Sequence, residues 1–322
     1  PCTEAADVAD DVYSDGARAL EGARQIKRLA AANKPFFLAV GFTKPHLPFN
    51  APTKYWELYQ REDFALPENL SWPPGYPQWA RNRGAGELRA YSDVPVEGTP
   101  ADFPNELNHR MLHGYHACVS YTDSNVGILL DALEAVNVAN NTVVVFWADH
   151  GWKLGDHSSW CKHTNFECDT RVPLMIRHPK IAAARGESKA LVELIDFPAT
   201  VEALTGVAPQ HTHFGRSLLP LLAGETDEHR DAVFCEGGRL HGEVHCMELE
   251  SKQYQDTDGL YYPRLYWQRR EGPEHTKAVM CRTRDWKYVR RLYETDELYD
   301  LRADPGETRN RIDDPDCAGV LA

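Results

Sequence analysis

The sequence predicts an α/β fold in which a mostly parallel sheet lies between helices, followed by a smaller antiparallel α+β subdomain. The first observation is that short β-branched and aromatic runs alternate with helical patterns, as in a parallel sheet. These runs are residues 35–41 (PFFLAVG), 142–147 (TVVVFW) and 173–177 (PLMIR). The second is that three strand-like runs follow residue 225 in a different pattern: 231–238 (DAVFCEGG), 278–293 and 297–301 (ELYDL). We therefore expect a large domain over 1–228 and a small subdomain over 229–322.

The helices follow from apolar residues at helical spacing. Residues 5–32 carry such a pattern, and Lys34-Pro35 ends it. Residues 105–137 predict a long helix, broken near Gly114 or Gly127, and a shorter helix is expected at 197–205. Residues 60–104 are rich in Pro, Gly and Trp with no sustained period. A loop of that length is a functional surface or a disordered segment.

Composition excludes some classes of function. The formal net charge of −13 argues against nonspecific nucleic-acid binding, and no apolar run approaches the roughly 20 residues that span a bilayer. The chain starts at Pro1 rather than Met, which predicts a trimmed N-terminus. Eight cysteines permit disulfides, with Cys161–Cys168 and Cys235–Cys246 as plausible pairs. The cysteine count and the acidic charge favour an oxidising compartment.

Residues 148–174 (ADHGWKLGDHSSWCKHTNFECDTRVPL) carry the strongest functional signal. Asp149 and His150 directly follow the apolar run 142–147, at the strand end where ligands bind in an open α/β sheet. Further charged side chains follow within about twenty residues, among them Lys153, Lys162 and His163. This pattern predicts a site for a metal and an anion.

Three stretches together resemble the type I sulfatases of the alkaline-phosphatase superfamily, and in particular the iduronate-type enzymes. They are PFFLAVGFTKPHLPF (35–49), residues 148–174, and DELYDLRADPGETRN (296–310). The resemblance implies one bound Ca²⁺, with Asp149 and His150 as part of its ligand set. It also implies that Lys162 contacts the sulfate and that His46 is the acid for the leaving alcohol.

Two further residues and one ligand choice are judged from their chemistry. Lys44 is a candidate for positioning an anion, and Trp152 for stacking on a sugar ring. Calcium prefers oxygen ligands, so the imidazole of His150 suits zinc or manganese better.

The family's nucleophile is a formylglycine made from the cysteine of a C-x-(P/S/A)-x-R motif, which lies upstream with an Asp-Asp metal pair. Neither is present here, and Cys235-Glu-Gly-Gly-Arg239 has only the Cys-to-Arg spacing. We therefore expect the carboxyl-terminal two-thirds of a sulfatase, inactive unless joined by its N-terminal segment, for which a separate chain is one source.

The predicted function is hydrolysis of sulfate monoesters, on carbohydrates of the glycosaminoglycan type, in a secreted, lysosomal or periplasmic protein. Two alternatives stay open. One is a phosphomonoester or phosphonate hydrolase of the same superfamily, which would use Thr or Ser and a transition metal. The other is a noncatalytic binding protein that keeps this fold.

Overall fold

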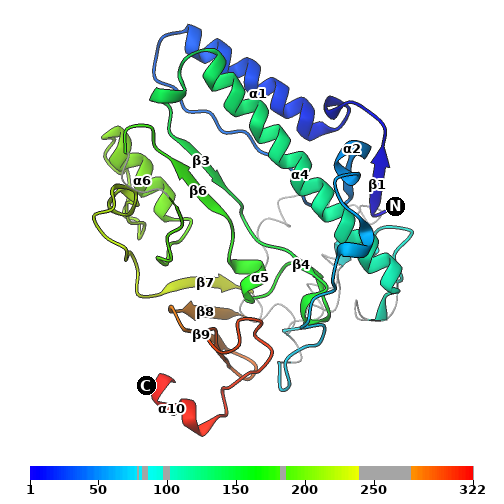
Figure 1. Cartoon of the computed structure of the whole chain (residues 1–322). Helices are drawn as coiled ribbons and strands as arrows, with labels where there is room; N and C mark the ends of the chain where they lie inside the picture. The colour runs from blue at the N-terminus through cyan, green and yellow to red at the C-terminus, as the bar shows by residue number, and fades with distance from the viewer. Residues whose placement is uncertain (78–79, 82–85, 97–101, 182–185, 239–276, 322) are drawn as a thin grey trace, which may run out of the picture.

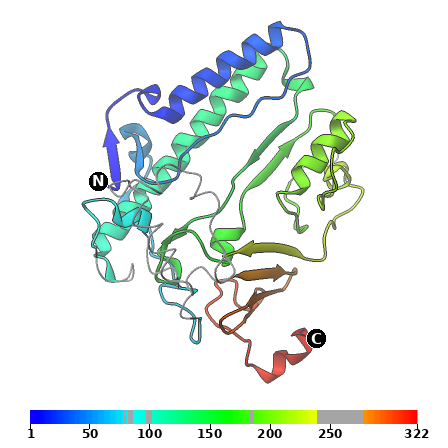
Figure 2. The same cartoon turned by 180° about the vertical axis from the view of Figure 1, so that it is seen from behind.

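A computed structural model describes residues 1–77, 80–81, 86–96, 102–181, 186–238 and 277–321 (Figure 1; Figure 2). The helices are α1 (Ser14–Ala31), α2 (Thr53–Trp56), α3 (Gly86–Arg89), α4 (Asn105–Ala135), α5 (Glu167–Thr170), α6 (Asp196–Thr205), α7 (Leu219–Ala223) and α10 (Ala318–Leu321). The strands are β1 (Thr3–Ala6), β2 (Phe49–Pro52), β3 (Val144–Trp147), β4 (Lys153–Leu154), β5 (Trp160–Cys161), β6 (Leu174–Arg177), β7 (Val233–Gly237), β8 (Ala278–Arg282), β9 (Trp286–Arg291) and β10 (Glu297–Asp300).

The long helices α1 and α4 lie side by side along one edge of the molecule in both views (Figure 1; Figure 2). The predicted break in α4 is wrong, because the helix runs without interruption from Asn105 to Ala135. Gly114 serves close packing instead. A Cβ at that position would lie 2.7 Å from Trp56 Cη2 and 2.9 Å from Phe49 Cβ.

The strand predictions around the site hold in part. The run 142–147 forms β3 and the run 173–177 forms β6, but the two pair antiparallel, with Phe146 opposite Met175. The alternation of strands and helices had predicted parallel pairing. Residues 35–41, predicted as a strand, form no strand in the structure. No residue of 35–41, β3 or β6 is buried. These apolar segments keep open faces, where strands of a parallel sheet would be covered on both.

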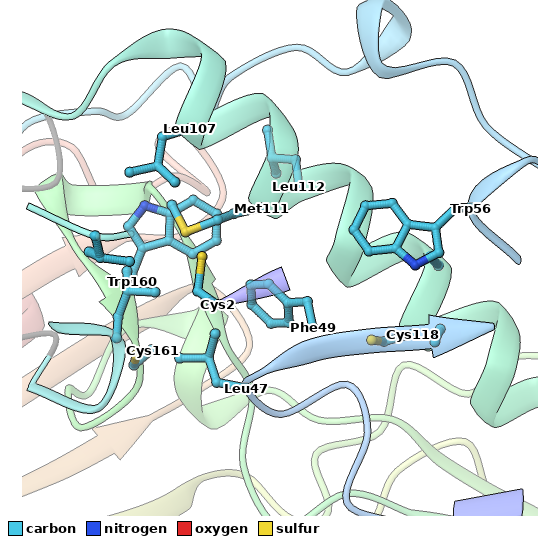
Figure 3. Packing of buried hydrophobic residues seen from close by; sticks show 14 of the residues in the cluster. Cys2, Leu47, Phe49, Trp56, Leu107, Met111, Leu112, Cys118, Trp160 and Cys161 are labelled. Carbon is cyan, nitrogen blue, oxygen red and sulfur yellow. The ribbon is translucent and has the colours of Figure 1, made fainter. Parts of the chain in front are cut away.

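The main core lies where α4 meets three chain segments from distant parts of the sequence. Leu107, Met111 and Leu112 of α4 point toward Leu47 and Phe49 at the start of β2, and toward Trp160 and Cys161 of β5 (Figure 3). Leu88 of α3 joins the same cluster and is completely buried. This core therefore fixes the backbone next to positions 46, 87 and 162.

The C-terminal strands form one antiparallel sheet in the order β10-β9-β8-β7, as the sequence predicted. A buried lysine of β9 joins this sheet to the loop after β5. Lys287 Nζ donates to Asn165 O at 2.8 Å and lies 2.9 Å from Glu167 and 2.7 Å from Glu307. Glu307 also accepts the backbone N–H of Glu167 at 2.6 Å. The run 296–310 thus holds the segment that follows Lys162.

Within the described residues, no helix is long and apolar enough to cross a membrane. The sequence left Cys161 and Cys168 open as a disulfide or as two free thiols, and in the structure both thiols are free. Cys235 is also free, and its suggested partner Cys246 lies outside the described residues. The domain boundary expected between residues 228 and 229 stays a prediction.

Candidate active site

His46 and Lys162 meet although 116 residues separate them in the sequence. The Lys162 ammonium lies 2.9 Å from His46 Nε2. His46 Nδ1 lies 2.9 Å from the carbonyl oxygen of Leu47. Because a carbonyl oxygen only accepts, Nδ1 carries the proton, and Nε2 is the nitrogen that exchanges one. The buried neighbours Leu47 and Cys161 hold both side chains in this position.

A carboxylate from the loop 60–104 completes the cluster. Glu87 Oε1 and Oε2 lie 3.0 and 2.8 Å from Lys162 Nζ, and Oε2 lies 3.0 Å from His46 Nε2. His163 Nε2 is 3.5 Å from Oε1. Burial opposes ionisation of Glu87, yet the hydrogen bonds from His163, His46 and Lys162 outweigh it and hold the pKa of this carboxyl well below its usual range. The cluster is a cationic pocket already filled by an anion.

Trp152 links this cluster to the metal-ligand candidates. Its ring lies 4.9 Å below the Lys162 ammonium, a cation–π distance, and 5.0 Å from the His46 ring in an edge-to-face arrangement. On its other side it is roughly parallel to the ring of His150, with centroids 6.3 Å apart. The structure therefore brings together positions 46, 150, 152 and 162.

Asp149 and His150 form a pair that suits a cation. His150 Nδ1 lies 2.8 Å from Gly151 O, so the proton is on Nδ1 and the lone pair of Nε2 is available to a metal. That nitrogen is 3.7 Å from Asp149 Oδ2, and the Asp149 side chain is 78% exposed. Gly151 allows α5 to approach closely, since a Cβ at Gly151 would lie 2.0 Å from Cys168 O.

Asp149 and His150 do not by themselves make up a metal site. In the described ranges, no group of three or more His, Cys, Asp or Glu side chains is placed to hold a metal ion. The carboxylate of Asp149 and the free Nε2 of His150 suit a metal only as a partial ligand set.

Lys44 does not join the cluster. Its ammonium donates to His46 O at 2.9 Å and to Pro48 O at 2.6 Å. Burial lowers its pKa, against the attraction of Asp15. Lys44 thus has two backbone partners, and its role in positioning an anion stays a prediction. The side chain braces the turn that presents His46.

Sequence reasoning missed Glu87. Neither a motif nor a period marks this residue, and only its place in the long loop 60–104 pointed to a functional surface. His163 was noticed as a charge beside Lys162 but was given no role. Its backbone φ of 83° is the left-handed conformation that few side chains adopt, and this turns its ring toward Glu87.

Comparison with known proteins decides the family. Residues 6–207, more than half of the chain, match the sequence model of the sulfatases. The chain belongs to the sulfatase family. It is 37% identical to the iduronate 2-sulfatase of Mus musculus over 183 residues, which are 55% of this chain and 32% of that protein. It is 28% identical to the choline-sulfatase of Rhizobium meliloti over 290 residues, or 88% of this chain and 48% of the relative.

Solved structures confirm the α/β fold class of this sulfatase. The phosphonate monoester hydrolase of Agrobacterium radiobacter superimposes with a TM-score of 0.72 at 24% identity, covering 98% of this chain and 60% of that one. A structure in complex with D-glucosamine-2-N,6-O-disulfate gives a TM-score of 0.64 at 20% identity, covering 94% and 67%. At these identities the likeness shows the fold alone.

The sulfatase chain spans about a third to a half of the curated relatives that it matches. Membership of the family generally implies a metal ion and a formylglycine. The donor atoms of Asp149 and His150 are of kinds that bind such a metal.

Proposed function

We propose that this chain supplies the sulfate-binding and proton-donating side of the active centre of a sulfuric ester hydrolase. One observation carries the proposal: the Lys162 ammonium and His46 Nε2 lie 2.9 Å apart, beside Trp152 of the loop that follows β3. This ammonium and this imidazole are the two groups that the proposed reaction requires from this chain. One stabilises anionic oxygens, and the other gives up a proton.

Each residue has a role that follows from its chemistry. Lys162 places a compact positive charge on the sulfuryl oxygens, where negative charge grows as the ester bond breaks. His46, protonated at Nε2, hands that proton to the oxygen of the departing alcohol. Its Nδ1–H bond to Leu47 O keeps the ring in the orientation that aims Nε2 at Lys162. Trp152 shields one side of the pair from water.

A Ca²⁺ bound at Asp149 and His150 would polarise the sulfuryl oxygens as a Lewis acid. The carboxylate of Asp149 is an oxygen ligand of the kind that calcium prefers. The remaining ligands, and the formylglycine nucleophile, are proposed to come from residues outside this chain. The open faces of β3 and β6 support this, because an apolar strand pair that ends in Asp149 offers a surface for more of the same domain.

Sulfated carbohydrate of the glycosaminoglycan type is the proposed substrate class. Its support is the naming of relatives, such as iduronate 2-sulfatase and the N-acetylglucosamine-6-O-sulfatase of Bacteroides thetaiotaomicron, which is 31% identical over 204 residues. Two aromatic residues of loop 60–104 pack within the protein and so add little support for a sugar-binding surface there. Trp72 and Tyr76 stack on each other at 5.0 Å, and Tyr76 stacks on Phe166. We propose a secreted, lysosomal or periplasmic location on the family resemblance alone.

The test is hydrolysis by a full-length protein that carries this chain. We expect release of sulfate from a 2-sulfated iduronate or 6-sulfated glucosamine saccharide, and a loss of about 10²–10³-fold in kcat for Lys162→Ala. His46→Ala should slow a sugar sulfate by about 10²–10⁴-fold and an aryl sulfate much less, because a phenolate leaves without needing a proton. The exposed residues Lys180 and His211 provide matched alanine controls. Turnover of aryl sulfates but of no sulfated saccharide would refute the carbohydrate assignment.

A phosphonate or phosphate ester hydrolase is the second candidate. The observation in its favour is His150, an imidazole where calcium would prefer oxygen, together with the fold shared with a phosphonate monoester hydrolase. Metal analysis of the full-length protein separates the two, since bound calcium supports the sulfatase and bound zinc or manganese supports the phosphatase. Asp149→Ala should lower the metal content in either case. Binding of the saccharide without any turnover would indicate a noncatalytic protein.

A further inference from the structure

We propose that Glu87 is an internal anion with which a sulfate group must compete for Lys162 and His46, so that it sets the affinity and the selectivity of the site. The inference rests on the proposed function, because it assigns the Lys162–His46 pair to sulfate. Its basis is the position of one carboxylate among three cationic or proton-bearing groups contributed by two other segments of the chain.

The contacts of Lys162 show why the two anions exclude each other. An ammonium has three N–H donors. Lys162 Nζ has Glu87 Oε1 at 3.0 Å, Glu87 Oε2 at 2.8 Å and His46 Nε2 at 2.9 Å. The Trp152 ring covers a further side at 4.9 Å. While His46 Nε2 is unprotonated and accepts one of these N–H groups, a sulfuryl oxygen reaches the ammonium at hydrogen-bond distance only when the carboxylate or the imidazole gives up a position.

Both ring nitrogens of His46 also have partners already. Its Nδ1–H is used by Leu47 O at 2.9 Å, which leaves Nε2 for any other partner. Nε2 already lies 3.0 Å from Glu87 Oε2. A protonated His46 therefore donates to Glu87 rather than to a leaving group for as long as Glu87 stays in place. Displacement of Glu87 frees the ammonium and the imidazole together, since one side chain occupies both.

The way in which Glu87 is held limits how it leaves. The next residue, Leu88, is 0% exposed and packs in the main core beside Cys161, so the backbone of α3 stays beside β5. The Glu87 side chain is 25% exposed, so part of it already contacts solvent. Three hydrogen-bonded partners keep the pKa of its carboxyl low, so mild acid does not neutralise it. Only another anion or a rotation of the side chain releases the site.

Glu87 therefore sets a minimum binding free energy that an anion must supply before it displaces the carboxylate. A small free anion gains only the contacts that Glu87 already makes, so it binds weakly. A sulfate carried on a larger molecule adds contacts elsewhere and can meet the cost of displacing the carboxylate. Glu87 is thus a specificity-determining residue that favours esterified sulfate over free sulfate, which is also the product.

The experiment measures binding of inorganic sulfate to this chain by isothermal titration calorimetry. Glu87→Gln keeps the shape and removes the charge, and Glu87→Ala removes the side chain. We expect both variants to bind sulfate at least about tenfold more tightly than the unchanged chain, which is about 1.4 kcal/mol. Glu57→Gln, at an exposed position of the same charge, should leave the affinity unchanged. Circular dichroism and thermal unfolding verify that the variants are folded.

The double variant Glu87→Gln/Lys162→Met tests where the anion binds, and its sulfate affinity should fall back to that of the unchanged chain or below. Equal affinity of the unchanged chain and both Glu87 variants would overturn the proposal, as would a gain that persists without Lys162. The readout is independent of catalysis. Tighter sulfate binding without hydrolysis by the full-length protein would uphold the role of Glu87 and defeat the proposed reaction. Hydrolysis by the full-length protein without tighter sulfate binding in the Glu87 variants would uphold the proposed reaction and defeat the role of Glu87.

Discussion

Lys153 and Asp169 form a buried ion pair whose removal should destabilise the segment that carries Lys162. Lys153 lies on β4 and its side chain is 0% exposed, while that of Asp169 on α5 is 4% exposed. Asp169 Oδ2 also accepts the N–H and the hydroxyl of Thr164, each at 2.7 Å. The pair thus connects β4 to the loop two residues beyond Lys162.

We expect Lys153→Met to lower the free energy of unfolding by about 3 kcal/mol. Removing one partner from a buried pair costs about 3–5 kcal/mol because the other charge stays buried without compensation. The lower end applies, since the two bonds from Thr164 still stabilise the Asp169 carboxylate. An exposed pair would contribute only about 0–1 kcal/mol.

Urea denaturation followed by circular dichroism measures the effect. The double variant Lys153→Met/Asp169→Asn should be more stable than Lys153→Met alone, because it removes the uncompensated charge as well. Lys180→Met, at an exposed position, is the matched control. The reasoning fails if Lys153→Met costs less than about 1 kcal/mol, or if the separately measured losses of Lys153→Met and Asp169→Asn simply add in the double variant.

Two further predictions concern packing and pH. Gly114→Ala should destabilise the chain by about 1–3 kcal/mol, because the new methyl group meets Trp56. Gly127→Ala, with open space around its Cβ in the same helix, should stabilise the chain by up to about 1 kcal/mol. Denaturation curves check this pair, since the changes in unfolding free energy should have opposite signs. Burial, followed by the charges of nearby lysines, lowers the pKa of His157 to about 3. Because the unfolded imidazole binds a proton near pH 6.5 and the folded one does not, the unfolding free energy should fall by about 2 kcal/mol between pH 7.5 and pH 5. His157→Asn should remove that part of the pH dependence while His211→Asn, at an exposed position, keeps it, and an unchanged pH profile in His157→Asn would contradict the assignment.

Local patterns predicted the elements whose character depends on neighbours in the sequence. The helices at 105–137 and 197–205 and the antiparallel C-terminal sheet appear where periodicity and strand-like runs placed them. The motif residues were also recognisable, because Asp149 and His150 follow a strand directly. The strand expected at 35–41 did not form, since a strand needs a partner and composition cannot supply one.

The sequence by itself determined which side chains bear the chemistry: an imidazole in a proline-rich turn, an aspartate and a histidine after a strand, and a lysine in the loop beyond. Only the tertiary structure decided that Glu87 meets Lys162 from 75 positions away, that Lys44 faces the backbone, and that Trp152 lies between the two halves of the site. The physical reason is that Leu47, Leu88 and Cys161 share one core. Their burial brings together polar neighbours that no local period connects, and the contacts of those neighbours depend on packing between distant segments.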